Sequence, residues 1–129
     1  MKQKIVGSYY AGNECVQLVL TDGCSGGEFY CVPERGATAR IKIGADTTWE
    51  CLFGILFHEI FELLFERLNG RYYPSGDTSN SMASYIFVAD HQVFGDICSR
   101  AAEFVDDCLP DLKKEHKLWN KKKKKTTRS

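Results

Sequence analysis

Residues 47–70 read TTWECLFGILFHEIFELLFERLNG, and this stretch decides the fold. Thr47 is followed three residues later by Glu50, which is the spacing of a capping box at a helix N-terminus. Gly70 is typical of the position just after a helix C-terminus. Between these signals, large apolar residues lie around most of the helical circumference, as in a helix that is covered on most sides. The sequence therefore predicts a buried central helix from about residue 47 to residue 69.

Four short segments rich in β-branched and aromatic residues precede this helix, and each is predicted to be a strand. Turn-forming stretches separate them; the segments are residues 5–10, 16–20, 28–32 and 39–43. A second, amphipathic helix is predicted from His91 to Leu109, with His91 on its apolar face and Pro110 at its end. The expected class is α+β, with a small, mainly antiparallel sheet packed on the central helix and the second helix.

The charge divides the chain into two parts. From Lys113 onward there are nine Lys and Arg against one Glu, a net charge of +8, so the remainder carries −8. We expect one domain over residues 1–112 and a basic, disordered tail over residues 113–129, with His116 as a solvated histidine in that tail. The five lysines of Lys121–Lys125 predict a weak contact with nucleic acid, without base stacking because no aromatic residue lies among them.

The cysteines and the N-terminus indicate the compartment. The six cysteines show no C-x-x-C spacing, and residues 1–6 lack the apolar segment of a signal peptide. No run of eighteen apolar residues predicts a transmembrane helix. We therefore expect reduced thiols in a cytoplasmic protein. A three-cysteine metal site from Cys15, Cys24 and Cys31 is an alternative that the sequence leaves open.

The ionisable residues of the central helix share one side. At 100° per residue, with His58 at zero, Glu62 lies near 40°, Glu66 near 80° and Glu59 near 100°. Burying several carboxylates and an imidazole without partners costs several kcal/mol each, and a divalent cation is one group that compensates. A core histidine that hydrogen-bonds Glu62, beside solvated Glu59 and Glu66, is the other interpretation.

The spacing of these residues predicts a metal site with a general base. His58 and Glu62 are one turn apart and can bind one ion, while Glu59 points beside it, as in H-E-x-x-H metalloproteases. Two histidines and one glutamate form a known catalytic zinc set, which requires a second histidine. We expect His91 in this role because it lies on the apolar face of its helix. The predicted ligands of one Zn²⁺ are therefore His58, Glu62 and His91, with Glu66 or Asp90 left open as a replacement or addition.

Residues 39–109 resemble minimal zincin-type metallopeptidases, in particular small phage-encoded zincin-like proteins with H-E-x-x-E followed by an Asp/His-rich helix start. The resemblance implies a minimal zincin-like fold, zinc ligands His58, Glu62 and His91, and Glu59 as general base. It also implies a peptide or protein substrate, a strand at residues 41–43 that binds an extended peptide at a sheet edge, and the host cytoplasm as location.

The leading hypothesis is a zinc-dependent hydrolase, specifically a metallopeptidase that uses Glu59 as its general base. One alternative is a non-catalytic, metal-stabilised binding or inhibitor module, such as a phage accessory protein. Another is a nucleic-acid-associated protein that acts through the lysine tail.

Overall fold

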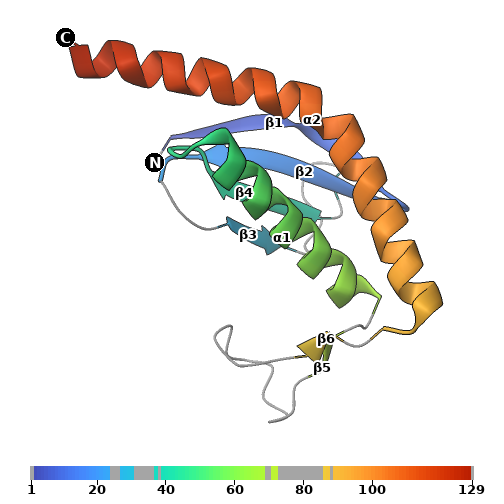
Figure 1. Ribbon diagram of the computed structural model, residues 1–129. Coiled ribbons are helices and arrows are strands. Elements are labelled where there is room, and N and C mark those ends of the chain that lie inside the picture. Colours follow the sequence, from blue (N-terminus) through green and yellow to red (C-terminus); the bar gives the residue numbers. More distant parts are fainter. Residues whose placement is uncertain are drawn as a thin grey trace.

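The chain forms a four-stranded sheet followed by two helices that pack against it (Figure 1). The computed structural model describes residues 2–23, 27–30, 37, 39–68, 71–72, 86–87 and 89–128. In chain order the elements are β1 (Gln3–Ala11), β2 (Glu14–Thr21), β3 (Gly27–Tyr30), β4 (Ala39–Gly44), α1 (Trp49–Arg67), β5 (Arg71–Tyr72), β6 (Ile86–Phe87) and α2 (His91–Arg128). The α+β class predicted from the sequence is confirmed.

The sheet is mixed, with the strand order β1-β2-β4-β3. β1 pairs with β2 and β3 with β4 in antiparallel fashion, whereas β2 and β4 run parallel. β4 therefore lies inside the sheet, with a hydrogen-bonded neighbour on each side. The expectation that residues 41–43 form an edge for an extended peptide is wrong, because β1 and β3 are the edge strands of this sheet.

The core lies between one face of the sheet and the two helices. Because side chains alternate along a strand, Leu18 and Leu20 of β2 share a face with their parallel partners Ile41 and Ile43 of β4. All four side chains are fully buried. They form one apolar cluster with residues of α1 and α2, including Leu56. On the opposite face of β2 and β4, the Arg40 side chain donates a 2.9 Å hydrogen bond to the Gln17 amide oxygen.

The helix α1 begins one residue later than the capping box predicts. Thr48 is the N-cap, and its hydroxyl oxygen accepts a hydrogen bond from the backbone N–H of Cys51. The Thr47 carbonyl oxygen instead accepts a hydrogen bond from His116 Nε2 at 2.9 Å. The helix ends with a cap at Leu68, and the predicted stop at residues 69–70 lies outside the described residues.

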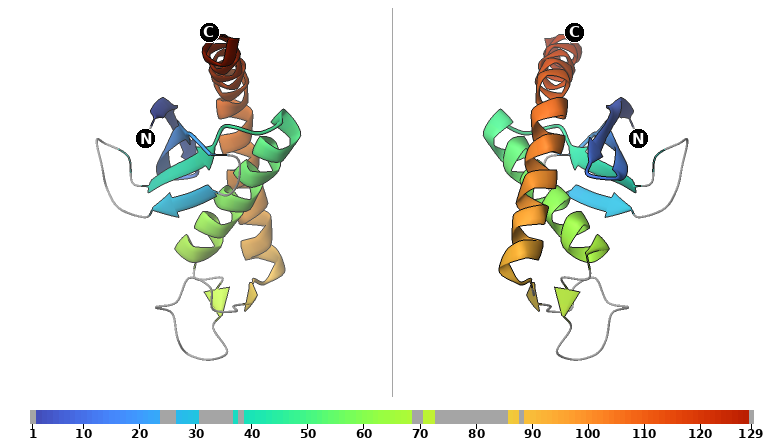
Figure 2. Two further views of the ribbon diagram at one scale, coloured as in Figure 1. Left: turned by 90° about the vertical axis from the view of Figure 1, so that its left-hand side faces the viewer. Right: turned by 90° about the vertical axis from the view of Figure 1, so that its right-hand side faces the viewer.

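The helix α2 is much longer than the sequence predicts. It continues through Pro110 to Arg128, a length of 38 residues, and Figure 2 shows it passing the sheet and projecting beyond it. The expected end at Pro110 is wrong, and residues 113–128, which were expected to form a disordered tail, lie in this helix. His116 is also buried rather than solvated, together with Leu112 and Trp119. The apolar stripe of α2 thus extends past the proline.

Asp46, in the connection from β4 to α1, links three separate parts of the chain. Its carboxylate accepts hydrogen bonds from the Gly23 backbone N–H at 2.8 Å and from Trp119 Nε1 at 2.9 Å. Lys123 Nζ lies 3.0 Å from the same carboxylate. These contacts, led by the Gly23 N–H, lower the pKa of Asp46 from 3.8 to about 2. The second half of α2 is therefore fastened to the domain by a charged residue as well as by its apolar stripe.

The strand β1 packs directly on α2. The Tyr9 hydroxyl donates a 2.7 Å hydrogen bond to the Asp111 carboxylate, and the Tyr9 ring meets Phe104 edge-on at 6.1 Å. Burial and the neighbouring Asp111 charge raise the pKa of Tyr9 above its ordinary value. This contact joins residues 102 positions apart in the sequence.

The described cysteines Cys15, Cys51, Cys98 and Cys108 carry free thiols. Cys24 and Cys31 lie outside the described residues, so the predicted three-cysteine alternative does too. Among the described helices, none combines the length and the apolar character that crossing a membrane requires.

Candidate metal site

His58, Glu59 and Glu62 form a compact group on α1. His58 Nε2 lies 3.2 Å from Glu62 Oε2 and 4.0 Å from Glu59 Oε1. One potential ligand atom from each residue lies within 4.8 Å of the other two. The helical spacing explains this geometry, because residues four apart lie one turn above each other on the same face. The structure thus brings together three of the four residues that the sequence predicts for the site.

The three side chains differ in their exposure to solvent. The His58 side chain is 65% exposed, whereas the Glu62 side chain is 17% exposed and the Glu59 side chain 5%. The interpretation of His58 as a core histidine is therefore wrong, although its contact with Glu62 is present. The imidazole of His58 is thus the part of the group that solvent reaches, whereas the carboxylate of Glu59 is buried.

Glu59 is held where β3 crosses α1. A Cβ atom at Gly27 would lie 2.9 Å from Glu59 Cγ and 2.7 Å from Ile55 Cγ2, so a side chain at this position would force Ile55 or Glu59 to shift. The contact fixes the buried carboxylate between the edge strand and the exposed histidine. Sequence reasoning missed Gly27, because no local pattern reveals which strand residue faces which turn of a helix.

The distances fit a divalent cation. Two ligands at about 2.0–2.1 Å from a tetrahedral zinc are about 3.4 Å apart, close to the separation of His58 Nε2 and Glu62 Oε2. The Glu59 oxygen is slightly farther from the imidazole than such a pair. A donor set with one imidazole nitrogen and carboxylates favours zinc over magnesium or calcium, which take oxygen ligands. The group can also exist without an ion, because a histidine and a glutamate at i and i+4 attract each other.

His91 does not belong to this group. It is the first residue of α2, as predicted, but it is exposed, so the expectation that it faces inward is wrong. Phe94, one turn later, contacts Phe65 near the end of α1, with ring centroids 6.5 Å apart. Phe65 follows His58 by seven residues, about 10 Å along the helix axis. The start of α2 therefore meets the far end of α1, and a metal-binding role for His91 stays a prediction.

The two residues that the sequence left open as additional ligands are both exposed. Asp90 caps α2: its carboxylate accepts a 2.8 Å hydrogen bond from the Val93 backbone N–H. Among the described residues, the group that could hold an ion consists of His58, Glu59 and Glu62, without Glu66 or Asp90.

No protein family model matches this chain, and neither a curated protein nor a solved structure shows detectable similarity to it. What the structure supports of the zincin-like resemblance is the H-E-x-x-E group on a helix packed against a sheet. The structure therefore supports a histidine–glutamate group whose geometry could hold a metal ion.

Proposed function

We propose that this protein is a zinc-dependent hydrolase, and that His58 and Glu62 are two of the ligands that hold the metal. The observation that carries the proposal is the 3.2 Å separation of His58 Nε2 and Glu62 Oε2 beside a buried third carboxylate. The exposed side of His58 leaves room for water and substrate, which a catalytic site requires and a closed structural zinc site lacks.

Glu59 is the general base in this proposal. Its position between Gly27 and His58 keeps the Glu59 carboxylate beside the metal pair, with Oε1 4.0 Å from His58 Nε2. When bound, zinc acidifies water and polarises a carbonyl group. Glu59 Oε1 takes the proton from the attacking water and passes it to the leaving amine, and peptides are the substrate class that the H-E-x-x-E pattern favours.

Zinc content and hydrolysis of quenched fluorescent peptides test this proposal together. The purified protein is expected to hold about one zinc per chain, and His58→Ala and Glu62→Ala are expected to lose it. Glu59→Gln is expected to keep the zinc and lose hydrolysis. Circular dichroism of every variant controls for folding. Protein that folds normally and binds no zinc at micromolar concentration would refute the metal site.

The same experiment separates an enzyme from a binding or inhibitor module. If Glu59→Gln also loses zinc, Glu59 is a ligand rather than a base, and the three residues form a structural site without catalysis. His91→Ala tests the sequence prediction independently: loss of zinc would make His91 a ligand, whereas full retention assigns the metal to α1 alone. The free thiols of the described cysteines fit a reducing compartment such as the cytoplasm.

A further inference from the structure

The second half of α2 presents its basic residues on one face. At 100° per residue, seven of them fall within about 120° of the helix circumference. The buried residues of the same segment, such as Leu112 and Trp119, lie on the opposite side against the domain. We call the seven the basic stripe: Lys113, Lys114, Lys117, Lys121, Lys124, Lys125 and Arg128, all of them exposed.

The basic stripe is rigid and long. It spans sixteen residues of continuous helix from Lys113 to Arg128, about 22 Å along the axis. The contacts of Asp46 with Trp119 and Lys123 hold the opposite face of the helix, so the lysines are displayed by a fixed element rather than by a flexible tail. A fixed array loses less conformational entropy on binding than a disordered one.

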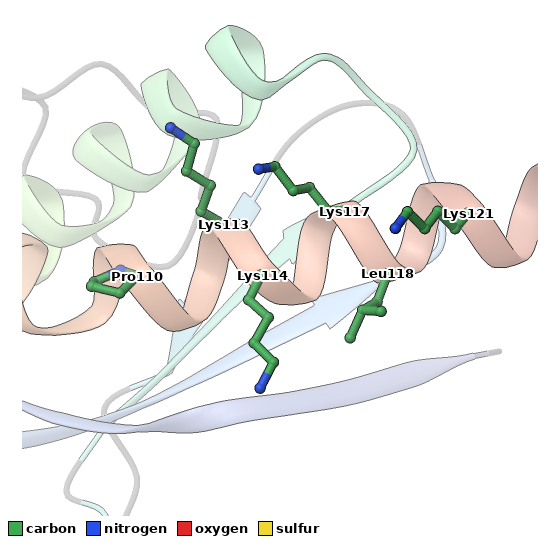
Figure 3. Close-up of a pocket in the computed structure, with 6 residues that line it drawn as sticks. All are labelled: Pro110, Lys113, Lys114, Lys117, Leu118 and Lys121. Atoms are coloured by element: carbon green, nitrogen blue, oxygen red, sulfur yellow. The ribbon is translucent and has the colours of Figure 1, made fainter.

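The outward face of α2 is also hollowed between its basic side chains. Figure 3 shows lysine side chains spreading to both sides of this face, around a shallow depression of about 370 Å³. The lining residues are Pro110, Lys113, Lys114, Lys117, Leu118 and Lys121. The depression is open, and four of its six lining residues are lysines, which suits an anionic partner lying along the helix.

We propose that the basic stripe binds the phosphate backbone of a nucleic acid duplex. A duplex carries a regular array of phosphates over the length of the stripe, and the major groove is wide enough to admit an α-helix. Binding of this kind reads no sequence. A single strand is a poorer fit, because binding of single strands relies on aromatic side chains that stack on the bases. In the described second half of α2 the indole of Trp119 is the side chain suited to stacking, and it is buried.

Two other anionic partners fit less well. A membrane-surface helix needs an exposed apolar face, but the apolar face of α2 packs on the domain, and Leu118 is the exposed large hydrophobic residue of the segment. An acidic protein surface fits poorly because lysine is depleted in protein interfaces, whose binding energy comes mainly from aromatic and arginine side chains.

Fluorescence anisotropy with a labelled 20-base-pair DNA duplex of arbitrary sequence tests the proposal on the full-length protein. If all seven residues engage phosphates, the plot of log affinity against log salt has a slope of about −6. The double variant Lys117→Gln/Lys121→Gln is expected to reduce this slope by about 2 and to weaken binding at 50 mM salt by at least about tenfold. The matched control, Lys4→Gln/Lys42→Gln, removes the same charge from the sheet and is expected to bind like the parent protein.

Four outcomes would overturn the proposal. The first is absence of duplex binding at 50 mM salt, and the second is an equal loss in the control variant. The third is binding to vesicles rich in phosphatidylserine without binding to the duplex, which would identify a membrane surface as the partner. A labelled single strand of the same sequence is expected to bind more weakly than the duplex, and stronger binding would contradict the groove model.

Discussion

Replacing Asp46 by asparagine removes the charge that ties the second half of α2 to the domain. The asparagine oxygen can still accept one hydrogen bond, from either Gly23 or Trp119, but the ionic contact with Lys123 is lost. The difference between a pKa of 3.8 and one of about 2 corresponds to at most about 2.5 kcal/mol of stability. Solvent screening lowers this, so we expect Asp46→Asn to reduce the free energy of unfolding by about 1–2 kcal/mol at pH 7.

The pH dependence gives this prediction its sign. The pKa of Asp46 is depressed in the folded state, so its contribution is fully present well above pH 3.8 and is lost as the pH falls towards 2. Wild type and variant are therefore expected to differ at pH 7 and to converge near pH 2. Urea unfolding followed by far-UV circular dichroism measures the difference without relying on Trp119 fluorescence.

The matched control is Asp106→Asn, which removes the same charge from an exposed position of α2 and is expected to change stability by less than about 0.5 kcal/mol. A loss at Asp46 no larger than the control, or a loss that persists unchanged at pH 2, would refute the reasoning. Either result would mean that the apolar stripe alone holds the helix.

Other substitutions test the core and the thiols. Phe104→Ala removes a fully buried ring and should cost about 3–5 kcal/mol in urea unfolding; a cost below about 1 kcal/mol would contradict its placement. Tyr9→Phe should cost about 1 kcal/mol at neutral pH and should remove a phenol that, in a spectrophotometric titration, ionises well above pH 10. Burial raises the pKa of the Cys108 thiol to about 12, so Cys51→Ser should remove one fast-reacting thiol from the native protein, whereas Cys108→Ser should remove none.

The central helix and the four strands were predictable because their signals are local. The large apolar residues of 51–65 indicate a helix, and the short segments rich in β-branched and aromatic residues before them indicate strands. The order of the strands was not predictable in the same way. In this order β4 lies between β2 and β3. The order depends on parallel pairing between β2 and β4, whose partners are about 23 residues apart in the sequence.

The proline rule alone does not predict the length of α2. A proline inside a helix costs about 3 kcal/mol, which predicts an end at Pro110. Burial of Leu112 and Trp119 beyond it contributes about 1.5–3 kcal/mol for each side chain, and the bonds to Asp46 and Thr47 add to this. The sum exceeds the cost of the proline, so the helix continues.

The candidate site was predictable only within α1. The i, i+1, i+4 spacing of His58, Glu59 and Glu62 is a property of one helix and survives in the structure. The placement of His91 depends on how two helices cross, which a one-dimensional pattern does not contain. An apolar stripe shows that a helix packs somewhere; it does not show which of its turns meets which turn of its partner.

The contact between Tyr9 and Asp111 has a consequence for biosynthesis. The strand β1 cannot pack on α2 until the ribosome has released residues about a hundred positions later in the chain. During translation β1 and β2 are exposed as an uncovered hairpin, with Leu18 and Leu20 open to solvent and to other nascent chains. A pause before Phe104 and Asp111 of α2 emerge would prolong this aggregation-prone stage, so α2 determines when β1 becomes covered.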